Sequence, residues 1–369
     1  MVSARGALAL ELVILSSVAA ALLAGAGAAW WFGRRRQAEG WAFVPEAPET
    51  AAAPPPAMDP ALLPQMRRRF LRAALGVEAG APDAADADAA DAPAHRQVAD
   101  AVVASLERAD LSQRYIPRRP HLLPQLIQSV NDSAASARSI GRIIGSDPLL
   151  TVNLLRIANS ALYRFQHQQV RSIERAVTLV GNEGIRQIIS AALVQPVMNP
   201  PDGDGGRFSQ RIWDYTLRMS LAAADHARSV EREDGFSAQL AGLLRGLGMV
   251  MVVRATADAY SRRQTLAPSP GLLLSLLEHC TPPLAARIAR EWNLSADVVA
   301  ALETAGQGAP RSPLARSLEI GELAAALAML CRENLLEEAQ ALELLSGCVP
   351  DHVGGWLWKR VSPDEPRDP

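Results

Sequence analysis

The sequence has few cysteines and few aromatic residues. Its three cysteines, Cys280, Cys331 and Cys348, stand far apart in 369 residues and include no Cys-x-x-Cys pair. An odd number of scattered cysteines builds neither a disulfide framework nor a zinc site, and it is typical of a reducing compartment. Aromatic residues make up only 5% of the chain. This scarcity disfavours a large β-sheet, because strands are enriched in aromatic and β-branched residues.

The chain also lacks an excess of positive charge. Lys and Arg number 37 against 39 Asp and Glu, which gives a formal net charge of -2. An excess of basic residues favours binding to nucleic acids, because the protein must neutralise their phosphates. The composition therefore predicts protein or membrane partners and no nucleic acid. Hydrophobic residues, at 49%, are sufficient for a large core.

One long uncharged run is present, over residues 12–32. About 20 apolar residues are enough for a helix to cross the hydrocarbon core of a bilayer. Trp30 and Trp31 at its end suit the headgroup region, and the three arginines at 34–36 favour the cytoplasmic side. We therefore expect an N-terminal tail and a single transmembrane helix over residues 1–33, with the rest of the chain in the cytoplasm.

A cleaved signal peptide is the alternative for this segment. Ala24, Ala26 and Ala28 offer small residues at which cleavage occurs. The uncharged run is longer than the roughly 7–15 residues of a signal-peptide core, and its strongest charge follows it. These two features favour the anchor.

Residues 34–95 have the composition of a flexible linker. Pro54-Pro55-Pro56 is a stiff patch, and the segment 83–94 alternates Asp with Ala and has no apolar face. Residues 61–76 differ, because apolar side chains recur there at helical spacing beside several arginines. They predict a short basic amphipathic helix, either on the membrane surface or surrounded by water.

From residue 96 to residue 358 the apolar residues have helical periodicity throughout, and no alternating strand pattern is evident. We therefore expect an all-α bundle over 96–358, followed by a disordered tail over 359–369. Residues that favour helix starts punctuate the pattern. They are Asp147-Pro148, Ser172, Ser237, Ser269-Pro270 and Ser295.

A motif near the middle of the chain carries a family resemblance. Asp147-Pro148-Leu149-Leu150 is followed by the segment 154–160, with the sequence LLRIANS, and by Tyr163. This resembles the pattern of the HDOD family, the helical output or regulatory domains of bacterial signalling proteins that are related to HD metal-dependent phosphohydrolases. The similarity extends from about Tyr115 to Leu330. Further landmarks are Trp213, Gly242-Leu243-Leu244, Trp292-Asn293-Leu294 and Pro313-Leu314-Ala315-Arg316.

The resemblance fails at the metal ligands. HD hydrolases bind metal ions through histidines and aspartates, and the metal activates a water molecule. The family pattern implies a histidine two residues after Trp213 and a His-Asp pair after Leu244, but this chain has Tyr215, Arg245 and Gly246 there. A guanidinium has no lone pair to donate, and glycine has no side chain. We therefore expect no catalytic residues, no metal and no cofactor.

Several other polar residues are candidates for function. Arg156, Asn159 and Tyr163 either pack at a helix end, with Asn159 satisfying backbone groups, or form a ligand or partner surface. Arg245 could bind an anionic small ligand. Three doublets place a carboxylate beside an imidazole, but each stands alone, whereas a metal site needs three or more converging ligands. They are Asp225-His226, Glu278-His279 and Asp351-His352.

The sequence thus predicts a membrane-anchored, non-catalytic HDOD signalling or regulatory scaffold at a bacterial inner membrane. Its partners are expected to be signalling proteins of unknown identity. A sensor of a nucleotide or another small ligand is the alternative. A phosphohydrolase with an unusual metal site is a further alternative, which requires ligands that the pattern does not supply.

Overall fold

The structure is a computed structural model, and it describes residues 58–77, 92–108, 148–159, 206–263, 265–306 and 311–362, together with residues 144, 170, 172, 175, 176, 184, 187 and 191. Every regular element in these ranges is a helix, so the all-α fold is confirmed. The expected transmembrane segment lies outside the described residues, as do the Pro-rich patch, most of the Asp/Ala segment and the end of the chain beyond residue 362.

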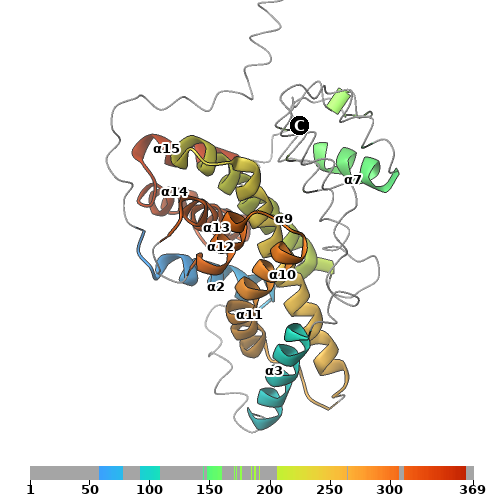
Figure 1. Cartoon of the computed structure of the whole chain (residues 1–369). Helices are drawn as coiled ribbons and strands as arrows, with labels where there is room; N and C mark the ends of the chain where they lie inside the picture. The colour runs from blue at the N-terminus through green and yellow to red at the C-terminus, as the bar shows by residue number, and fades with distance from the viewer. Residues whose placement is uncertain are drawn as a thin grey trace, which may run out of the picture. The chain divides into compact units, whose positions relative to one another are not determined.

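Figure 1 shows the helices in chain order. They are α2 (Leu62–Ala74), α3 (Ala92–Glu107), α7 (Pro148–Ala158), α9 (Gly206–His226), α10 (Gly235–Ser261), α11 (Pro270–Glu291), α12 (Ala296–Thr304), α13 (Pro313–Arg332), α14 (Glu338–Ser346) and α15 (Asp351–Val361). A π-helical turn, η1 (Ala227–Glu231), continues α9.

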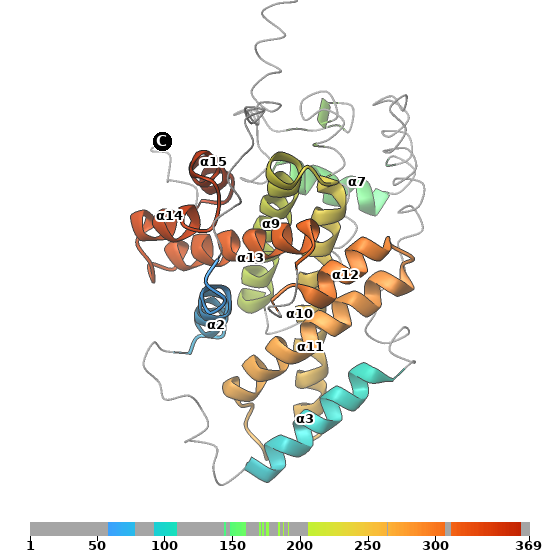
Figure 2. The same cartoon turned by 60° about the vertical axis from the view of Figure 1, so that its left-hand side comes forward.

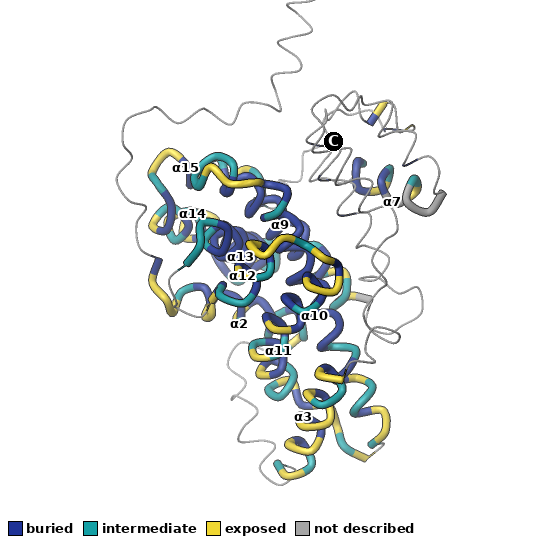
Figure 3. The backbone as a smooth tube through the Cα atoms, viewed as in Figure 1, coloured by how far each residue is buried: buried dark blue, intermediate teal, exposed yellow. Residues whose placement is uncertain are grey.

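Helix α13 is at the centre of the described bundle. It packs against α2, α9, α10, α12, α14 and α15 (Figures 1 and 2). Its apolar residues are buried around the helix, as Figure 3 shows, and they include the whole leucine stripe of the sequence. The stripe is Leu314, Leu318, Leu323, Leu327 and Leu330.

Helix α9 lies close to both α10 and α13 because each of these helices presents a glycine to it. A Cβ atom on Gly242 of α10 would lie 2.7 Å from the Cα atom of Ser220. A Cβ atom on Gly321 of α13 would lie 2.6 Å from the carbonyl oxygen of Met219. Only glycine permits such an approach of two backbones. The two contacts fix α9, and with it Tyr215, between α10 and α13.

One described helix, α10, is long and apolar enough to cross a membrane. Most of it is buried within the protein, however, including Leu243, Leu244 and Leu247. A helix that is apolar on all sides and covered by other helices is a core helix of the domain.

Local sequence signals locate several helix starts. The hydroxyl groups of Ser269 and Ser295 accept hydrogen bonds from Leu272 N and Val298 N, as their positions predicted. The cap expected at Ser237 is wrong by three residues. Asp234 caps α10 instead, since its carboxylate accepts hydrogen bonds from Phe236 N and Ser237 N.

The expected domain limits need correction. The domain limits at 96 and 358 fall inside α3 and α15. The helix expected over 61–76 is α2, but its apolar face is buried in the bundle, so it is neither a membrane-surface helix nor a solvated one. The apolar stripe of residues 61–76 predicted the helix, but the Pro- and Asp-rich composition around it indicated a linker and gave no sign of its packing partners.

Candidate functional site

The three positions where the resemblance calls for metal ligands do come together. Tyr215 of α9 donates a hydrogen bond of 3.3 Å to Oε1 of Glu322 on α13. Nη2 of Arg245, on α10, lies 3.2 Å from Oε2 of the same carboxylate. The side chains of Tyr215, Arg245 and Glu322 are almost completely buried, and the exposed fraction of Arg245 is 1%.

A second arginine reaches this carboxylate from α2. Nη1 of Arg67 lies 3.5 Å from Oε1 of Glu322, which is an ion pair without close hydrogen-bond geometry. One helical turn further on, the ring of Phe70 stacks on Tyr215, with 4.5 Å between the ring centroids and 25° between the planes. Helix α2 therefore covers the site with the guanidinium group of Arg67, next to Glu322, and the ring of Phe70, next to Tyr215.

A second carboxylate on α13 completes the group of buried charges. Glu319 accepts a hydrogen bond of 2.7 Å from Gly306 N and pairs with Nη1 of Arg311 at 3.2 Å. Together with the residues around Glu322, these side chains form a group of six that we call the arginine–carboxylate cluster. Its members are Arg67, Tyr215, Arg245, Arg311, Glu319 and Glu322. Three guanidinium groups and two carboxylates give the cluster one excess positive charge.

Burial and neighbouring charges shift the pKa values of the cluster in opposite directions. Burial raises the pKa of Glu322, but the positive charges of Arg245 and Arg67 together lower it by more. The pKa of Glu322 is therefore below its ordinary value. Burial and the charge of Glu322 raise the pKa of Tyr215 well above its usual range, so the phenol stays neutral. Burial lowers the pKa of Arg245, and Glu322 partly offsets this effect.

Gly246 leaves no room for a ligand. A Cβ atom at this position would lie 2.0 Å from Oγ1 of Thr216 on α9. The hydroxyl group of Thr216 is held there by a hydrogen bond of 2.7 Å to the carbonyl oxygen of Ile212. The two helices are therefore too close for an aspartate at the position of Gly246.

These residues do not fit the metal ions of an HD hydrolase. Tyr215 is neutral, Arg245 is a cation, and the single carboxylate between them is already paired with two guanidinium groups. Within the described residues, no three His, Cys, Asp or Glu side chains gather as a metal site requires. The chemistry of the donors thus opposes metal binding at this position.

The Asp225-His226 doublet does not form a ligand pair in the structure. Asp225 forms ion pairs with Arg228 and Arg360, whereas Nδ1 of His226 lies 3.0 Å from the hydroxyl oxygen of Ser317. In the second doublet, Nδ1 of His279 is 2.8 Å from the carbonyl oxygen of Ser275. The imidazole of His226 thus packs within the bundle, whereas that of His279 is exposed and contacts the backbone of its own helix.

Asn159 joins two segments of backbone. Its side-chain amide donates to the carbonyl oxygen of Val170 at 2.8 Å, and its side-chain oxygen accepts a hydrogen bond of 2.8 Å from Val170 N. These are the backbone contacts that the packing interpretation predicts. Arg156 is exposed on α7, whereas Arg245 is buried, and Tyr163 lies outside the described residues.

Sequence reasoning missed Arg67, Glu319 and Glu322. The sequence places Arg67 among the basic residues of a helix expected on the membrane surface or in water. The two glutamates did leave a signal, because they stand three residues apart within the apolar stripe of residues 313–332. Carboxylates on a face that is otherwise buried are rarely left unpaired.

Comparisons with known proteins agree with this architecture. Solved structures that resemble it include a presumed metal-dependent phosphohydrolase from Shewanella amazonensis SB2B, with 17% identity, a TM-score of 0.50, and coverage of 72% of this chain and 97% of that one. An HDOD domain protein with unknown function from Geobacter sulfurreducens has 15% identity and a TM-score of 0.48, with 73% and 89% of the two chains covered. A presumed signal transduction protein from Marinobacter aquaeolei VT8 has 18% identity and a TM-score of 0.47, with 72% and 63% covered.

At such identities the likeness concerns the fold alone. No curated protein matches the chain. A model of the HDOD domain matches residues 116–307, which is more than half of the sequence. The chain therefore belongs to the HDOD domain family.

Proposed function

We propose that this HDOD protein is a non-catalytic signalling or regulatory scaffold, anchored to the inner face of a bacterial membrane, that acts through contacts with other proteins. The observation that supports this most strongly is the ion pair of Arg245 with Glu322, at a position where the resemblance implies a metal ligand. A protein of this family without metal ligands can still act by binding other molecules.

The charge of Arg245 opposes metal binding in a second way. Two unit positive charges at 4 Å repel each other by about 4 kcal/mol at an effective dielectric constant of 20. Arg67 adds a second cation on the same carboxylate. A metal ion would therefore have to displace two guanidinium groups and then bind to one carboxylate and a phenol.

The membrane anchor in this proposal depends on the sequence of residues 1–36. The uncharged run 12–32 and the arginines that follow it favour one crossing, with the HDOD domain in the cytoplasm. Anchoring would concentrate the domain near membrane-bound signalling proteins.

A hydrolysis assay tests the absence of catalysis. The full-length protein, purified in detergent without chelators, is incubated with Mn²⁺, Mg²⁺, Fe²⁺ or Ni²⁺ and with phosphoesters that include cyclic dinucleotides. We expect no turnover above the rate with metal alone, in either the natural chain or an Arg245→Ala variant. Turnover that a chelator abolishes and added metal restores would instead establish a phosphohydrolase.

One observation favours a second candidate, the sensor of an anionic ligand. Nε of Arg67 and both Nε and Nη1 of Arg245 are buried without a hydrogen-bond acceptor. Guanidinium groups in such surroundings bind phosphate or carboxylate well. Thermal unfolding with and without millimolar nucleotides tests this candidate. A rise in Tm that an Arg67→Met variant lacks would support it, and no rise with any nucleotide would oppose it.

A further inference from the structure

Gly306 lies beside two buried guanidinium groups. It follows α12 with a φ of +84°, and its N–H donates a hydrogen bond of 2.7 Å to Oε1 of Glu319. Apart from its chain neighbours, a Cβ atom added here would have two atoms of the described residues within 4 Å. These are Nη2 of Arg67 at 3.7 Å and Nη2 of Arg245 at 3.8 Å. The position that a side chain would occupy is therefore bordered by two cationic nitrogens, and we call it the Gly306 site.

The same two guanidinium groups carry donors that the protein does not use. Nε of Arg67 and both Nε and Nη1 of Arg245 are buried without a hydrogen-bond acceptor among the described residues. The exposed fractions of these residues are 9% and 1%. Buried polar groups almost always have a partner, and where the protein supplies none, a water molecule or an ion is the usual one. The unused donors thus point to a polar species bound beside the two arginines.

Charge favours an anion over a water molecule in this role. Arg311 pairs with Glu319 at 3.2 Å, whereas Arg67 and Arg245 share the single carboxylate of Glu322. Burial lowers the pKa of Arg67, but Glu322 and three further residues raise it by more, so Arg67 keeps its charge. One positive charge of the arginine–carboxylate cluster is therefore not balanced. One negative charge balances it, which a water molecule does not supply.

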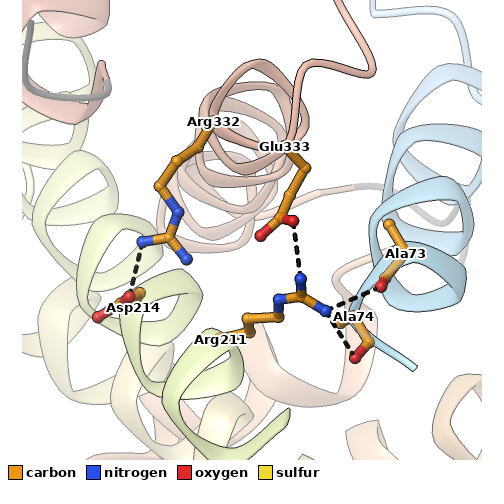
Figure 4. A network of polar contacts seen from close by, with 6 residues as sticks. All are labelled: Ala73, Ala74, Arg211, Asp214, Arg332 and Glu333. Carbon is orange, nitrogen blue, oxygen red and sulfur yellow. Dashed lines mark hydrogen bonds and ion pairs between the residues drawn. The ribbon is translucent and has the colours of Figure 1, made fainter. Parts of the chain in front are cut away.

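Helix α2 presents Arg67 to the Gly306 site from a fixed position. Nη1 of Arg211 donates hydrogen bonds of 3.1 and 3.2 Å to the carbonyl oxygens of Ala73 and Ala74 at the end of α2 (Figure 4). Nη2 of Arg211 pairs with Glu333 at 2.8 Å. The last carbonyl groups of a helix have no partner within the helix, so these donors hold its end. Donors that are held in place before a ligand arrives lower the cost of binding it.

We propose that a small monovalent anion of the size of chloride binds at the Gly306 site, between the guanidinium groups of Arg67 and Arg245. Charge-assisted hydrogen bonds from guanidinium groups are strong contacts for anions. A nucleotide would have to displace α2, because the ring of Phe70 on this helix stacks on Tyr215. The ion joins α2, which precedes the segment that matches the family, to α10 within that segment. This inference goes beyond the proposed scaffold function, and it differs from the nucleotide sensor in the size of the ligand.

Thermal unfolding of the full-length protein in detergent tests for the anion. Chloride is replaced stepwise by the bulky anion gluconate at constant ionic strength, which keeps the general screening of charges unchanged. We expect the Tm to rise with chloride, by about 3 °C at roughly ten times the Kd, because the ion binds the folded chain and not the unfolded one. Bromide should raise the Tm as chloride does. The same Tm in chloride and in gluconate would overturn the proposal.

Gly306→Ala and Gly76→Ala are a matched pair of variants. Both glycines have a positive φ, of +84° and +74°, so alanine strains the backbone at either position. The new methyl group occupies the anion site only at Gly306, since no atom lies within 4 Å of a Cβ on Gly76. We therefore expect Gly306→Ala to lose the rise of Tm with chloride and Gly76→Ala to retain it. Equal behaviour of the two variants, as a general effect of salt would produce, would overturn the proposal.

Broadening of the chloride NMR resonance measures binding to the folded chain without unfolding it. The natural chain and Gly76→Ala should broaden the resonance, and added bromide should reverse the effect. Arg245→Met should bind chloride at least about tenfold more weakly, because it loses a charged donor. No broadening by the natural chain would contradict the proposal without any variant. Neither readout involves a metal or hydrolysis, so failure of the anion site is distinct from failure of the proposed non-catalytic function.

Discussion

Arg245 and Glu322 form an ion pair of 3.2 Å in the interior of the bundle, with both side chains almost completely buried. The pair joins α10 to α13 and uses the one carboxylate that Tyr215 also contacts. In an HD hydrolase, ligands at corresponding positions would hold a metal ion that activates water. Here the side chains at these positions are paired with one another through Glu322.

Glu322→Gln should therefore be strongly destabilising. The substitution leaves two buried arginines without their shared counter-charge, and loss of one partner of a buried ion pair costs about 3–5 kcal/mol. Chemical denaturation of the full chain in detergent measures the change. Glu333→Gln is the matched control, because its ion pair with Arg211 is partly exposed and should contribute about 0–1 kcal/mol. Equal effects of the two substitutions would contradict the role given to Glu322.

Gly246→Ala should also destabilise the protein, by about 3 kcal/mol, because the new methyl group meets Thr216 in a packed core. Gly246→Asp, which restores the aspartate of the family pattern, should be worse and should not create a metal site. Gly355→Ala is the control. This exposed helical glycine has no atom within 4 Å of an added Cβ, so alanine should stabilise the chain by about 1 kcal/mol. A folded Gly246→Asp chain that binds metal would refute the steric argument.

Local rules of the sequence predicted much of the fold. The caps at Ser269 and Ser295 and the leucine stripe of α13 follow from the preferences of single residues and from helical periodicity. Asp234 was overlooked because Ser237, three residues later, is an equally plausible cap by residue type. Helix α2 was assigned to the linker because its partners lie far away in the sequence, on α9, α11 and α13.

The buried imidazole of His226 predicts a dependence of stability on pH. Burial, with a contribution from Arg316, lowers the pKa of His226 to about 4. The unfolded chain takes up a proton near pH 6.5, whereas the folded chain does so only near pH 4. Stability should therefore fall as the pH falls from about 6.5 to about 4, by about 3 kcal/mol, and this contribution should level off below pH 4.

Urea denaturation between pH 8 and pH 4 measures this slope. His226→Gln should flatten it in the stated window, because the side chain no longer titrates. His279→Gln, at an exposed position, should retain it. A natural chain whose stability does not change between pH 6.5 and pH 4, or a slope that persists in His226→Gln, would show that His226 is not the group responsible.

The N-terminal sequence predicts firm membrane attachment. The uncharged run 12–32 should keep the protein with membranes after washing with high salt and carbonate, because hydrophobic insertion is insensitive to both. A reporter enzyme fused after Pro369 should be active only if it works in the cytoplasm. Release by carbonate would show that residues 12–32 do not anchor the protein, and activity of a periplasmic reporter would show the opposite topology.

The site could be predicted only in part. The family resemblance placed Tyr215, Arg245 and Gly246 at one location, and the structure brings the three positions together. The resemblance gave no indication of Glu322, which lies 107 positions beyond Tyr215. It also gave no indication of Arg67, which belongs to a helix outside the matched segment. Which distant side chain pairs with a buried charge depends on helix packing, and periodicity alone does not determine that packing.

We propose that paired side chains have replaced the metal of the HD site. Elemental analysis of the full-length protein, purified in detergent without chelators and then dialysed against Mn²⁺ or Fe²⁺, tests this proposal without any assumption about substrate. We expect far less than one metal ion per chain, and the same low content in Arg245→Ala, since Tyr215 and Glu322 alone provide too few ligands. About one tightly held transition-metal ion per chain, removed by chelation and rebound afterwards, would contradict it.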